Sequence, residues 1–417
     1  MKKYIPIKIK ARLKNFSQYL YLLAYHFTKP IYKDLVKSKK IISSNQRHCF
    51  FGYYDLTPFS EDDKLLLGMQ TQTPLRTPAK GDKLKVGYYD LTSENLRFNT
   101  FGETETWCWQ QGCRLRWFPG SNEYVIYNTL VDGNYGAVVK DINTRDAIEK
   151  YPFSLYDMAI NGENGLTLNF SRLQRLRPGY GYGVIGDITQ DVNCPDDDGV
   201  WVVDLKTKKK ELLYSLKDLS IIEPLSSMED AEHYINHLSI NPSGTVYLFL
   251  HLWVNRKQNK RYSRLFTDNI GGNNLKLINN TGYVSHYTWQ SDDILIVFTW
   301  YGNNKKRYCK FENNGTFHGV IGKDLLKEDG HPSFIGNNKY MVADTYPNLA
   351  RDQLLILYNL DSNKLKVLTR FKVPHNFTGE VRCDLHPRVN KSGNMICVDN
   401  VIDNYRAMSI INLEGVI

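Results

Sequence analysis

The chain has few cysteines for its length, and their spacing matches neither a zinc site nor a redox pair. The seven cysteines form an odd, scattered set without a Cys-x-x-Cys spacing, and several lie in apolar runs where a thiol behaves as a small apolar side chain. This usage favours a reducing compartment. The longest apolar run near the start, residues 19–25, is too short to span a bilayer, and no small-residue cleavage site follows it. The sequence therefore predicts a cytoplasmic protein.

Motifs of three common enzyme classes are also missing. The sequence contains no Gly-x-Ser-x-Gly, no phosphate-binding glycine-rich loop with Lys-Ser or Lys-Thr, and no His-Glu-x-x-His. Hydrolase-fold, nucleotide-binding and zincin functions therefore have no support. The formal net charge of +9 falls mostly before the repeats begin, so the body of the chain is nearly balanced and no nucleic-acid partner is predicted.

Aromatic and apolar residues are abundant by contrast. Hydrophobic residues make up 42% of the chain, which contains 28 tyrosines, 18 phenylalanines and 7 tryptophans. This content is ample for a core, and aromatic residues favour strands. The composition therefore predicts a sheet protein.

A repeated strand pattern holds one histidine at the same register in four successive units. In each unit the histidine lies a few residues before a polar turn, and an apolar segment follows the turn. A period of about 45 to 55 residues with short strands and no long helix is typical of a β-propeller. The four histidines are His237, His286, His331 and His386.

Seven units can be counted, which predicts an all-β, seven-bladed β-propeller over residues 39–417. The first three lie near residues 52–90, 112–127 and 166–216, and the histidine-bearing units begin near residues 233, 283, 330 and 384. The last unit has room for only three strands. Residues 40–43 are therefore predicted to supply its fourth strand and to close the ring.

The segment before the propeller, residues 1–38, is basic and has apolar residues at three- and four-residue steps. This pattern predicts a short N-terminal helical extension. A basic amphipathic segment would lie on an anionic membrane, peripheral to the inner membrane, or on a partner. The alternative is a helix packed against the side of the propeller.

The first residues of the innermost strands surround one funnel in a propeller, so the four histidines are expected to converge. Neutral imidazole ligates divalent metals and titrates near neutral pH, so a cluster suits metal binding or acid–base chemistry. The alternative for one such histidine is a half-buried side chain satisfied by its turn, but four in register favour a site. His251, beyond His237, is predicted at the same funnel or its rim, with Trp253 beside it; the alternative is a polar strand end.

Residues 168–182 break the strand pattern with three arginines and a glycine-tyrosine loop. Guanidinium groups match carboxylates with two hydrogen bonds, and tyrosines stack on sugar rings. Arg172, Arg175 and Arg177 are therefore predicted to orient an acidic saccharide, with structural ion pairs as the alternative. Asp344 and Asp399 close two inner strands and are predicted to cap turns. Further substrate contacts are predicted at His48, Tyr54, Asp55, Gln111 and Arg388.

With its units in this order, the chain resembles the oligogalacturonate lyase family, intracellular seven-bladed propellers that cleave short acidic pectin oligomers by β-elimination. The resemblance covers roughly residues 230–413 and consists of single residues. These are His237 with His251, His286 in the sequence His-Tyr-Thr-Trp, His331 and His386.

The resemblance implies a divalent metal, typically manganese, which histidines and a glutamine hold and which neutralises a uronate carboxylate. It implies His286 and His386 as ligands, with His331 next. Asp384 stands where the family has a histidine and preserves a ligand, whereas Val381 replaces the glutamine. The implied metal residues are thus His286, His331, His386 and Asp384.

These residues predict a metal-assisted lyase that acts on a uronate-containing oligosaccharide, with His237 or His251 as the base or carboxylate partner. Residues 51–55 and 176–182 are also similar to those of bacterial propellers associated with surface-polysaccharide synthesis, some of them labelled glycosyltransferases. The alternatives are therefore a non-catalytic glycan-binding or scaffold propeller, or a glycosyltransferase-associated protein, in such a system.

Overall fold

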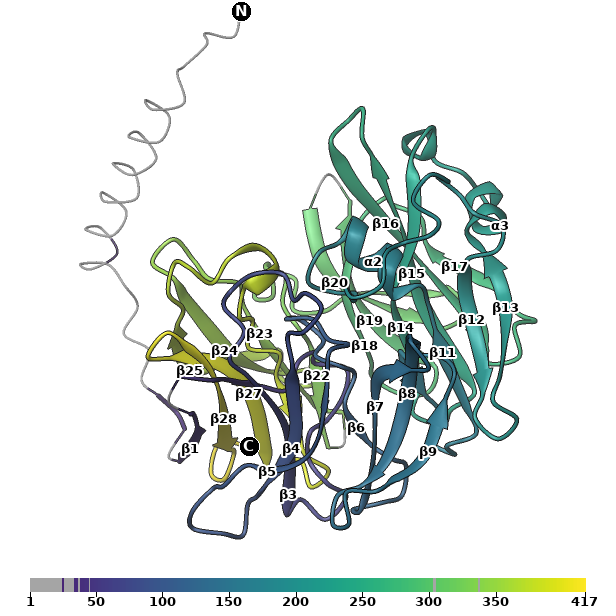
Figure 1. Ribbon diagram of the computed structural model, residues 1–417. Helices are drawn as coiled ribbons and strands as arrows, with labels where there is room; N and C mark the ends of the chain where they lie inside the picture. Colours follow the sequence, from purple (N-terminus) through teal and green to yellow (C-terminus); the bar gives the residue numbers. More distant parts are fainter. Residues whose placement is uncertain (1–24, 26–33, 37, 45, 303–304, 337) are drawn as a thin grey trace, which may run out of the picture.

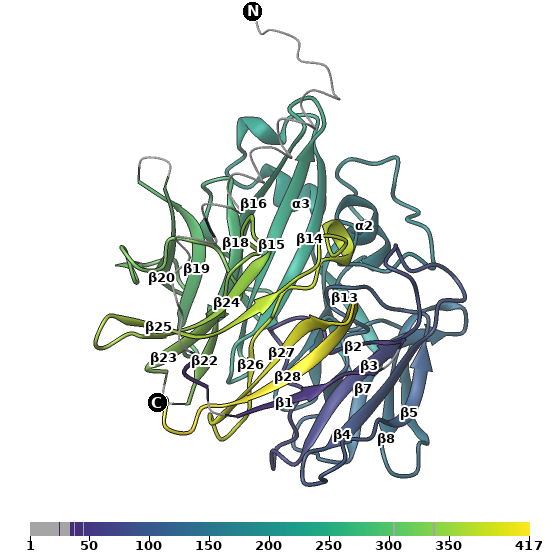
Figure 2. The same cartoon turned by 90° about the vertical axis from the view of Figure 1, so that its left-hand side faces the viewer.

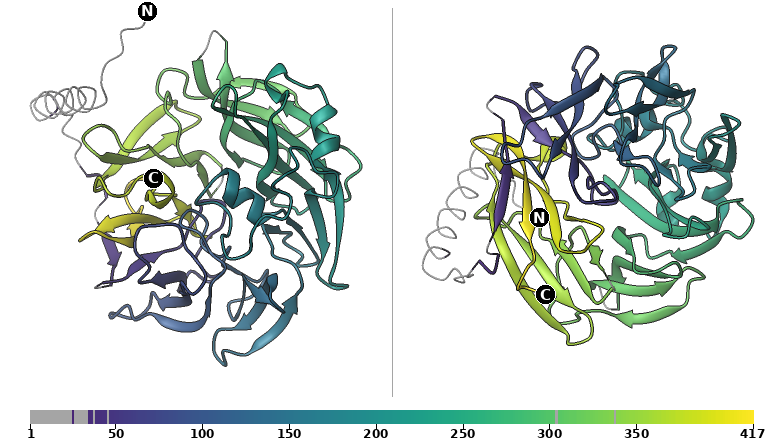
Figure 3. Two further views of the ribbon diagram at one scale, coloured as in Figure 1. Left: turned by 45° about the horizontal axis from the view of Figure 1, so that its top comes forward. Right: turned by 90° about the horizontal axis from the view of Figure 1, so that it is seen from below.

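Seven four-stranded antiparallel sheets are arranged as blades around a central axis (Figures 1 and 3). The computed structural model describes residues 25, 34–36, 38–44, 46–302, 305–336 and 338–417. The predicted seven-bladed β-propeller is confirmed. The predicted helical extension over residues 1–38 falls almost entirely outside the described residues. No helix among the described residues is long and apolar enough to cross a membrane.

The strands of the first six blades follow one another in sequence across each sheet. Blades one to three contain β2 (His48–Phe50), β3 (Leu65–Thr71), β4 (Leu84–Asp90) and β5 (Asn99–Thr104), then β6 (Arg116–Trp117), β7 (Tyr124–Val131), β8 (Asn134–Asp141) and β9 (Ala147–Tyr151), then β10 (Asp157–Met158), β11 (Asn164–Thr167), β12 (Gly199–Asp204) and β13 (Lys209–Ser215). Blades four and five contain β14 (Glu232–Ile240), β15 (Val246–Asn255), β16 (Lys260–Asn269) and β17 (Lys276–Asn279), then β18 (Val284–Trp289), β19 (Ile294–Tyr301), β20 (Lys305–Glu312) and β21 (Phe317–Val320). Blades six and seven contain β22 (Ser333–Ile335), β23 (Tyr340–Asp344), β24 (Asp352–Asn359) and β25 (Lys364–Lys372), then β26 (Arg388–Val389), β27 (Met395–Ile402) and β28 (Tyr405–Asn412).

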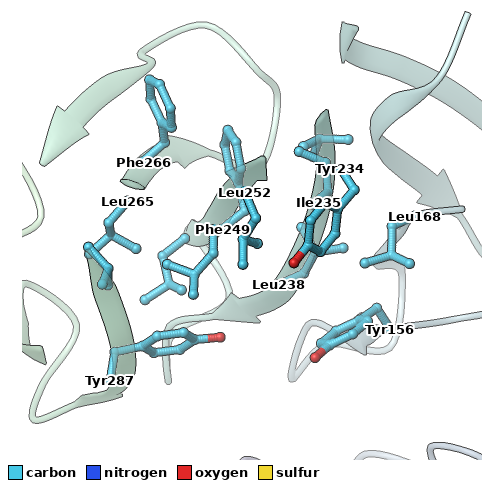
Figure 4. Packing of buried hydrophobic residues seen from close by; sticks show 14 of the residues in the cluster. Tyr156, Leu168, Tyr234, Ile235, Leu238, Phe249, Leu252, Leu265, Phe266 and Tyr287 are labelled. Carbon is cyan, nitrogen blue, oxygen red and sulfur yellow. The ribbon is translucent and has the colours of Figure 1, made fainter. Parts of the chain in front are cut away.

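The middle strands of a blade are buried on both faces because each blade packs between two neighbours. In β15, all residues from 247 to 253 are buried. Figure 4 shows Phe249 and Leu252 of this strand beside Leu265 and Phe266 of β16. The same apolar cluster extends to Tyr287 of blade five, so the core is continuous from blade to blade.

The ring closes by pairing the first described strand with the last. Blade seven has the order β1-β28-β27-β26, in which β1 (Lys39–Ile42) is antiparallel to β28 (Figure 2). Lys39 lies opposite Ile411, and Ile42 lies opposite Met408. The closure predicted from the missing fourth strand is confirmed, one residue earlier than expected.

Blade three is interrupted between β11 and β12 by residues 168–198, whose short helix lies toward the centre of the ring (Figure 3, left). This segment contains the short helix α2 (Phe170–Leu176), whose N-cap Asn169 accepts a hydrogen bond from the backbone of Arg172. The helix ends before Pro178, which cannot continue it. Further helical elements in residues 46–417 are α3 (Leu216–Ile221), η1 (Ser226–Met228) and η2 (Gly379–Val381).

The chain that leaves β2 is fixed against blade seven and blade two. The backbone N–H groups of Phe51 and Gly52 donate to the carboxylate of Asp399, each at 3.2 Å. Gly52 has φ +121°, and a Cβ there would lie 2.9 Å from the carbonyl carbon of Gln111. Only glycine fits this position, and it directs Tyr53 and Tyr54 toward the centre of the ring.

Removal of β1 should destabilise the ring. Deletion of residues 1–46 exposes the edge of β28 and removes the buried Ile42, whose burial alone is worth roughly 2 kcal/mol. Deletion of residues 1–33 keeps β1 and serves as the matched control. Thermal unfolding of both truncated proteins measures the difference, and equal stability would contradict the closure.

Candidate functional site

Three of the four repeated histidines converge at the centre of the ring. His286 belongs to β18, and His331 and His386 directly precede the inner strands of blades six and seven. The ring centroids of His286 and His331 lie 4.2 Å apart, and those of His331 and His386 lie 4.3 Å apart. All three side chains are almost fully buried. We call these residues the histidine cluster.

One nitrogen of each ring in the histidine cluster is held by a protein acceptor. His286 Nδ1 lies 2.9 Å from Asp329 Oδ1, and His331 Nδ1 lies 2.9 Å from Asp344 Oδ1. His386 Nδ1 lies 2.7 Å from the carbonyl oxygen of Gly52. The Nε2 atom of all three rings is buried and has no hydrogen-bond partner among the described residues. An Nδ1–H held by an acceptor leaves the Nε2 lone pair free to bind a metal.

Asp384 adds a carboxylate to this arrangement. Its Oδ2 accepts a hydrogen bond from Arg382 Nε at 2.6 Å, whereas its Oδ1 is buried without a partner among the described residues. The ligand atoms of His331, Asp384 and His386 all lie within 4.8 Å of one another. Histidine nitrogens with one carboxylate oxygen fit a divalent transition metal. Val381, by contrast, offers an apolar side chain and no ligand.

The electrostatic surroundings differ among the three rings. Burial lowers the pKa of His386 well below its ordinary value, and the neighbouring His331 and arginines lower it further. Burial also lowers the pKa of His286, because the opposing effect of Asp329 does not outweigh it. Burial lowers the pKa of His331 as well, but the Asp344 carboxylate more than compensates, and the net shift is upward. His286 and His386 are therefore neutral at pH 7, as metal ligands must be, whereas a metal at His331 would have to displace a proton whose binding Asp344 favours.

Tyr53 and Tyr54 pack against the histidine cluster. Tyr53 lies edge-on to His386 with ring centroids 4.8 Å apart, and Tyr54 lies 5.2 Å from His331. Tyr54 was predicted to contact substrate, but its hydroxyl donates to the carbonyl of Tyr287 at 2.7 Å and accepts from the same residue's N–H at 3.2 Å. Tyr54 therefore contributes its ring to the site, while its hydroxyl is occupied.

The fourth histidine, His237, lies behind Tyr53. Its ring stacks on that of Tyr53 at 4.9 Å, and its Nε2 lies 3.3 Å from the Tyr53 hydroxyl. Its Nδ1 lies 3.1 Å from the hydroxyl of Tyr156. A β-bulge in β14, where His237 has φ +55°, turns the ring into this position. Because both nitrogens are hydrogen-bonded to tyrosines, His237 presents no free nitrogen to a ligand.

Arg177 is the one predicted arginine that faces the centre. Its guanidinium stacks on Tyr180 at 4.1 Å, and Tyr180 lies edge-on to Tyr53 with ring centroids 6.0 Å apart. Within the described part of the chain, Arg177 forms no ion pair. Burial is the main cause that lowers the pKa of His237, and the positive charge of Arg177 lowers this pKa further. Tyr180 also accepts a hydrogen bond from Arg382, which ties residues 168–198 to Asp384.

His251 and Trp253 are not in the funnel, contrary to the prediction. They lie in β15, the second strand of blade four, and both are fully buried. His251 Nε2 lies 2.8 Å from His233 Nδ1, and its Nδ1 accepts from Arg264 Nε at 3.1 Å. Because this strand is buried on both faces, its polar side chains point between blades and not into the central opening.

Arg172 and Arg175 stabilise residues 168–198. Contrary to the prediction, they do not face the funnel. The guanidinium of Arg172 donates only to oxygens of that segment and of His233, namely those of Thr189, Val192, Asn193 and His233. Arg175 pairs with Asp187 at 2.8 Å and with Glu232 at 2.5 Å. The structural alternative for these two arginines is therefore the correct one.

Four further predicted substrate contacts are occupied by protein partners. Asp55 forms a bidentate ion pair with Arg114, at 2.9 and 3.0 Å. Gln111 donates to the Tyr156 hydroxyl at 2.7 Å, and the buried Arg388 pairs with Asp399 at 2.7 Å. His48 accepts from the backbone of Arg406 at 3.1 Å and packs on Trp109. Each of these four side chains thus has a protein partner, and their roles as substrate contacts stay predictions.

The sequence analysis missed residues that complete the site. Asp329 and Asp344 orient two of the histidines, and Tyr53, Tyr180 and Arg382 surround them. One signal for such a site is present in the sequence, because the spacing Asp-x-His occurs at residues 329–331 and again at residues 384–386.

The fold is a seven-bladed propeller similar to those of solved oligogalacturonate lyases. No protein-family model matches the chain, and no curated protein matches it in sequence. An oligogalacturonate lyase in complex with manganese superposes with a TM-score of 0.64 over 91% of this chain and 95% of that chain, at 13% identity. The oligogalacturonate lyase of Vibrio parahaemolyticus superposes with a TM-score of 0.63 over 92% of this chain and 97% of that chain, at 12% identity. Identities this low show the fold alone.

Buried histidines outside the cluster should make the fold sensitive to acid. Burial lowers the pKa of His48 and of His233 to about 4, so both stay neutral in the folded protein while the unfolded chain protonates them below about pH 6.5. The two histidines therefore do not reduce the free energy of unfolding above pH 6.5. Below pH 6.5 the free energy of unfolding falls as the pH drops toward 4. Between pH 7.5 and 5.5 we expect a loss of about 1 kcal/mol or more.

Chemical denaturation at the two pH values measures this loss. The variant His48→Gln should lose less stability on acidification than the wild type. The variant of the exposed His318, His318→Gln, is the control. An identical pH dependence in wild type and His48→Gln would contradict the assignment.

Proposed function

We propose that the protein is a metal-dependent carbohydrate lyase that cleaves a uronate-containing oligosaccharide by β-elimination. The observation that carries this proposal is that ligand atoms of His331, Asp384 and His386 lie within 4.8 Å of one another. The Nε2 atoms of the histidine cluster and Oδ1 of Asp384 are also buried without a hydrogen-bond partner among the described residues. The similarity of fold to a lyase in complex with manganese supports a divalent metal and an acidic oligosaccharide.

His331, His386 and Asp384 would hold the metal, with His286 at the side of His331. A divalent cation supplies charge neutralisation at a uronate carboxylate, which acidifies the adjacent C–H group. The carboxylates of Asp329 and Asp344 hold the Nδ1 protons of two rings, so the Nε2 lone pairs of these rings are left to bind a metal. These contacts fix the ligand atoms before any metal binds.

Arg177 is suited to bind the carboxylate of an acidic sugar. Among the described residues it has no acidic partner, and it lies on Tyr180, whose ring borders Tyr53. A guanidinium with unused donors matches a carboxylate in charge and shape. The face of the funnel beneath residues 168–198 thus combines a cation with aromatic rings, as recognition of a uronate requires.

A second candidate function is a glycan-binding propeller without catalysis. Two observations favour it: the Nε2 atoms of the cluster are buried, with Tyr346 packed against His331, and Val381 provides no amide ligand. In this case the protein would bind an acidic saccharide without forming product. A metal at the histidine cluster would then stabilise three neighbouring blades.

Metal content and product formation separate the two functions. The wild type should bind about one equivalent of Mn²⁺, and His331→Ala should lose it because two or three ligands no longer suffice. Elemental analysis measures the metal, and ultraviolet absorbance of the unsaturated product measures cleavage of oligogalacturonates. His318→Ala, on the surface of blade five, is the control. Metal without product would favour the binding function, and no metal uptake would refute the metal site.

Loss of a carboxylate that orients a histidine should weaken metal binding, although no ligand is removed. In Asp344→Asn the Nδ1–H of His331 faces a neutral amide, and we expect a roughly 10- to 100-fold lower affinity for Mn²⁺. Isothermal titration measures the affinity. Asp352→Asn changes another buried carboxylate of blade six that does not contact the cluster, so it should keep the wild-type affinity. Equal affinities of the two variants would show that Asp344 does not orient His331.

A further inference from the structure

A chain of buried hydrogen bonds runs from blade two to the centre of the ring. Gln111 Nε2 donates to the Tyr156 hydroxyl at 2.7 Å, which lies 3.1 Å from His237 Nδ1. His237 Nε2 in turn lies 3.3 Å from the Tyr53 hydroxyl. All four side chains are at most 3% exposed. We call this chain the relay.

Two directions are possible for the relay, and each leaves one phenolic proton unpaired. If His237 Nδ1–H donated to the Tyr156 oxygen, which can accept twice, the Tyr156 proton would have no acceptor among the described residues, and we take the opposite direction. An amide N–H can only donate, so the Tyr156 oxygen accepts from Gln111, and its own proton has His237 Nδ1 as its acceptor among the described residues. A neutral imidazole that accepts at Nδ1 carries its proton on Nε2, and Nε2–H donates to the Tyr53 oxygen. The phenolic proton of Tyr53 then has no acceptor within the described part of the chain.

This unused donor lies between the proposed metal ligands and Arg177. The Tyr53 ring lies 4.8 Å from that of His386 and 5.8 Å from that of His331. On its other side, Tyr180 separates it from the Arg177 guanidinium. A buried donor without a partner is unfavourable, and an oxygen anion beside it would relieve this.

We propose that the Tyr53 hydroxyl donates a hydrogen bond to the carboxylate of an acidic sugar bound at the histidine cluster, and that Gln111, Tyr156 and His237 are positioning residues that keep it a donor. The identity of the ligand rests on the proposed function, whereas the direction of the relay does not. This donor would also stabilise the negative charge that develops on the carboxylate when the adjacent C–H loses its proton.

Tyr156 tests the direction, because it is separated from any ligand by His237. In Tyr156→Phe, His237 Nδ1 loses its donor. Fewer buried groups then remain unpaired if the imidazole moves its proton to Nδ1 and accepts from Tyr53 at Nε2. The Tyr53 proton would turn away from the ligand, so a change remote from the ligand should weaken its binding.

The first measurement is the tautomer of His237 in the ligand-free protein. Nuclear magnetic resonance of the protein labelled with ¹⁵N-histidine reports which nitrogen carries the proton, and His237→Asn identifies the signal by its loss. We expect Nε2–H in the wild type and Nδ1–H in Tyr156→Phe. Nδ1–H in the wild type, or no change in the variant, would overturn the relay whatever the protein's function.

The second measurement is the affinity for D-galacturonate, with D-galactose as the ligand that lacks the carboxylate. Tyr53→Phe and Tyr156→Phe should each weaken galacturonate binding about tenfold and leave galactose binding unchanged, and the double variant should be no weaker than Tyr53→Phe. Tyr182→Phe, which removes another buried hydroxyl, is the control. Unchanged affinity in Tyr53→Phe would overturn the carboxylate contact while leaving the proposed lyase intact. No galacturonate binding by the wild type would overturn that contact and the proposed substrate together, and the tautomer would still decide the relay.

Discussion

The buried ion pair between Arg388 and Asp399 holds the chain that fills the centre of the ring. The Asp399 carboxylate accepts from the backbone of Phe51 and Gly52, and Arg388 donates to the Gly52 carbonyl at 2.8 Å. The same carbonyl also accepts from His386. Because both charges are fully buried, loss of either partner would leave the other uncompensated, which typically costs 3–5 kcal/mol. The orientation of a proposed metal ligand and the path of the central chain therefore depend on one interaction.

The central chain separates two kinds of polar chemistry. On one side of Tyr53, the rings of His331 and His386 have one nitrogen fixed by the protein and one without a partner. On the other side, both nitrogens of His237 are bonded to tyrosines. The structure thus divides histidines of equal register into those that can bind an external group and one that can only orient its neighbour.

The regular part of the fold could be predicted from the sequence, because its period is set by strand length and turn spacing. The same register brought His286, His331 and His386 together, and the missing strand of the last blade pointed to residues 40–43. The side-chain environment could not be predicted in the same way. A strand buried on both faces, such as β15, does not reveal whether His251 faces the funnel or a neighbouring blade. The guanidinium of Arg172 donates to backbone carbonyls of residues 168–198, and the positions of these carbonyls follow no repeat in the sequence.

The ring closure has a consequence for the order of assembly during synthesis. A ribosome delivers β1 before every other strand described here, yet the partner of β1 is β28, the last of them. Blades five to seven carry the histidine cluster, so all three of its members are also made late. The first strand must wait unpaired until nearly the whole chain has emerged, since domains fold as units during translation. The ring can therefore close only when nearly the whole chain has been made, and the histidine cluster is completed at the same late stage.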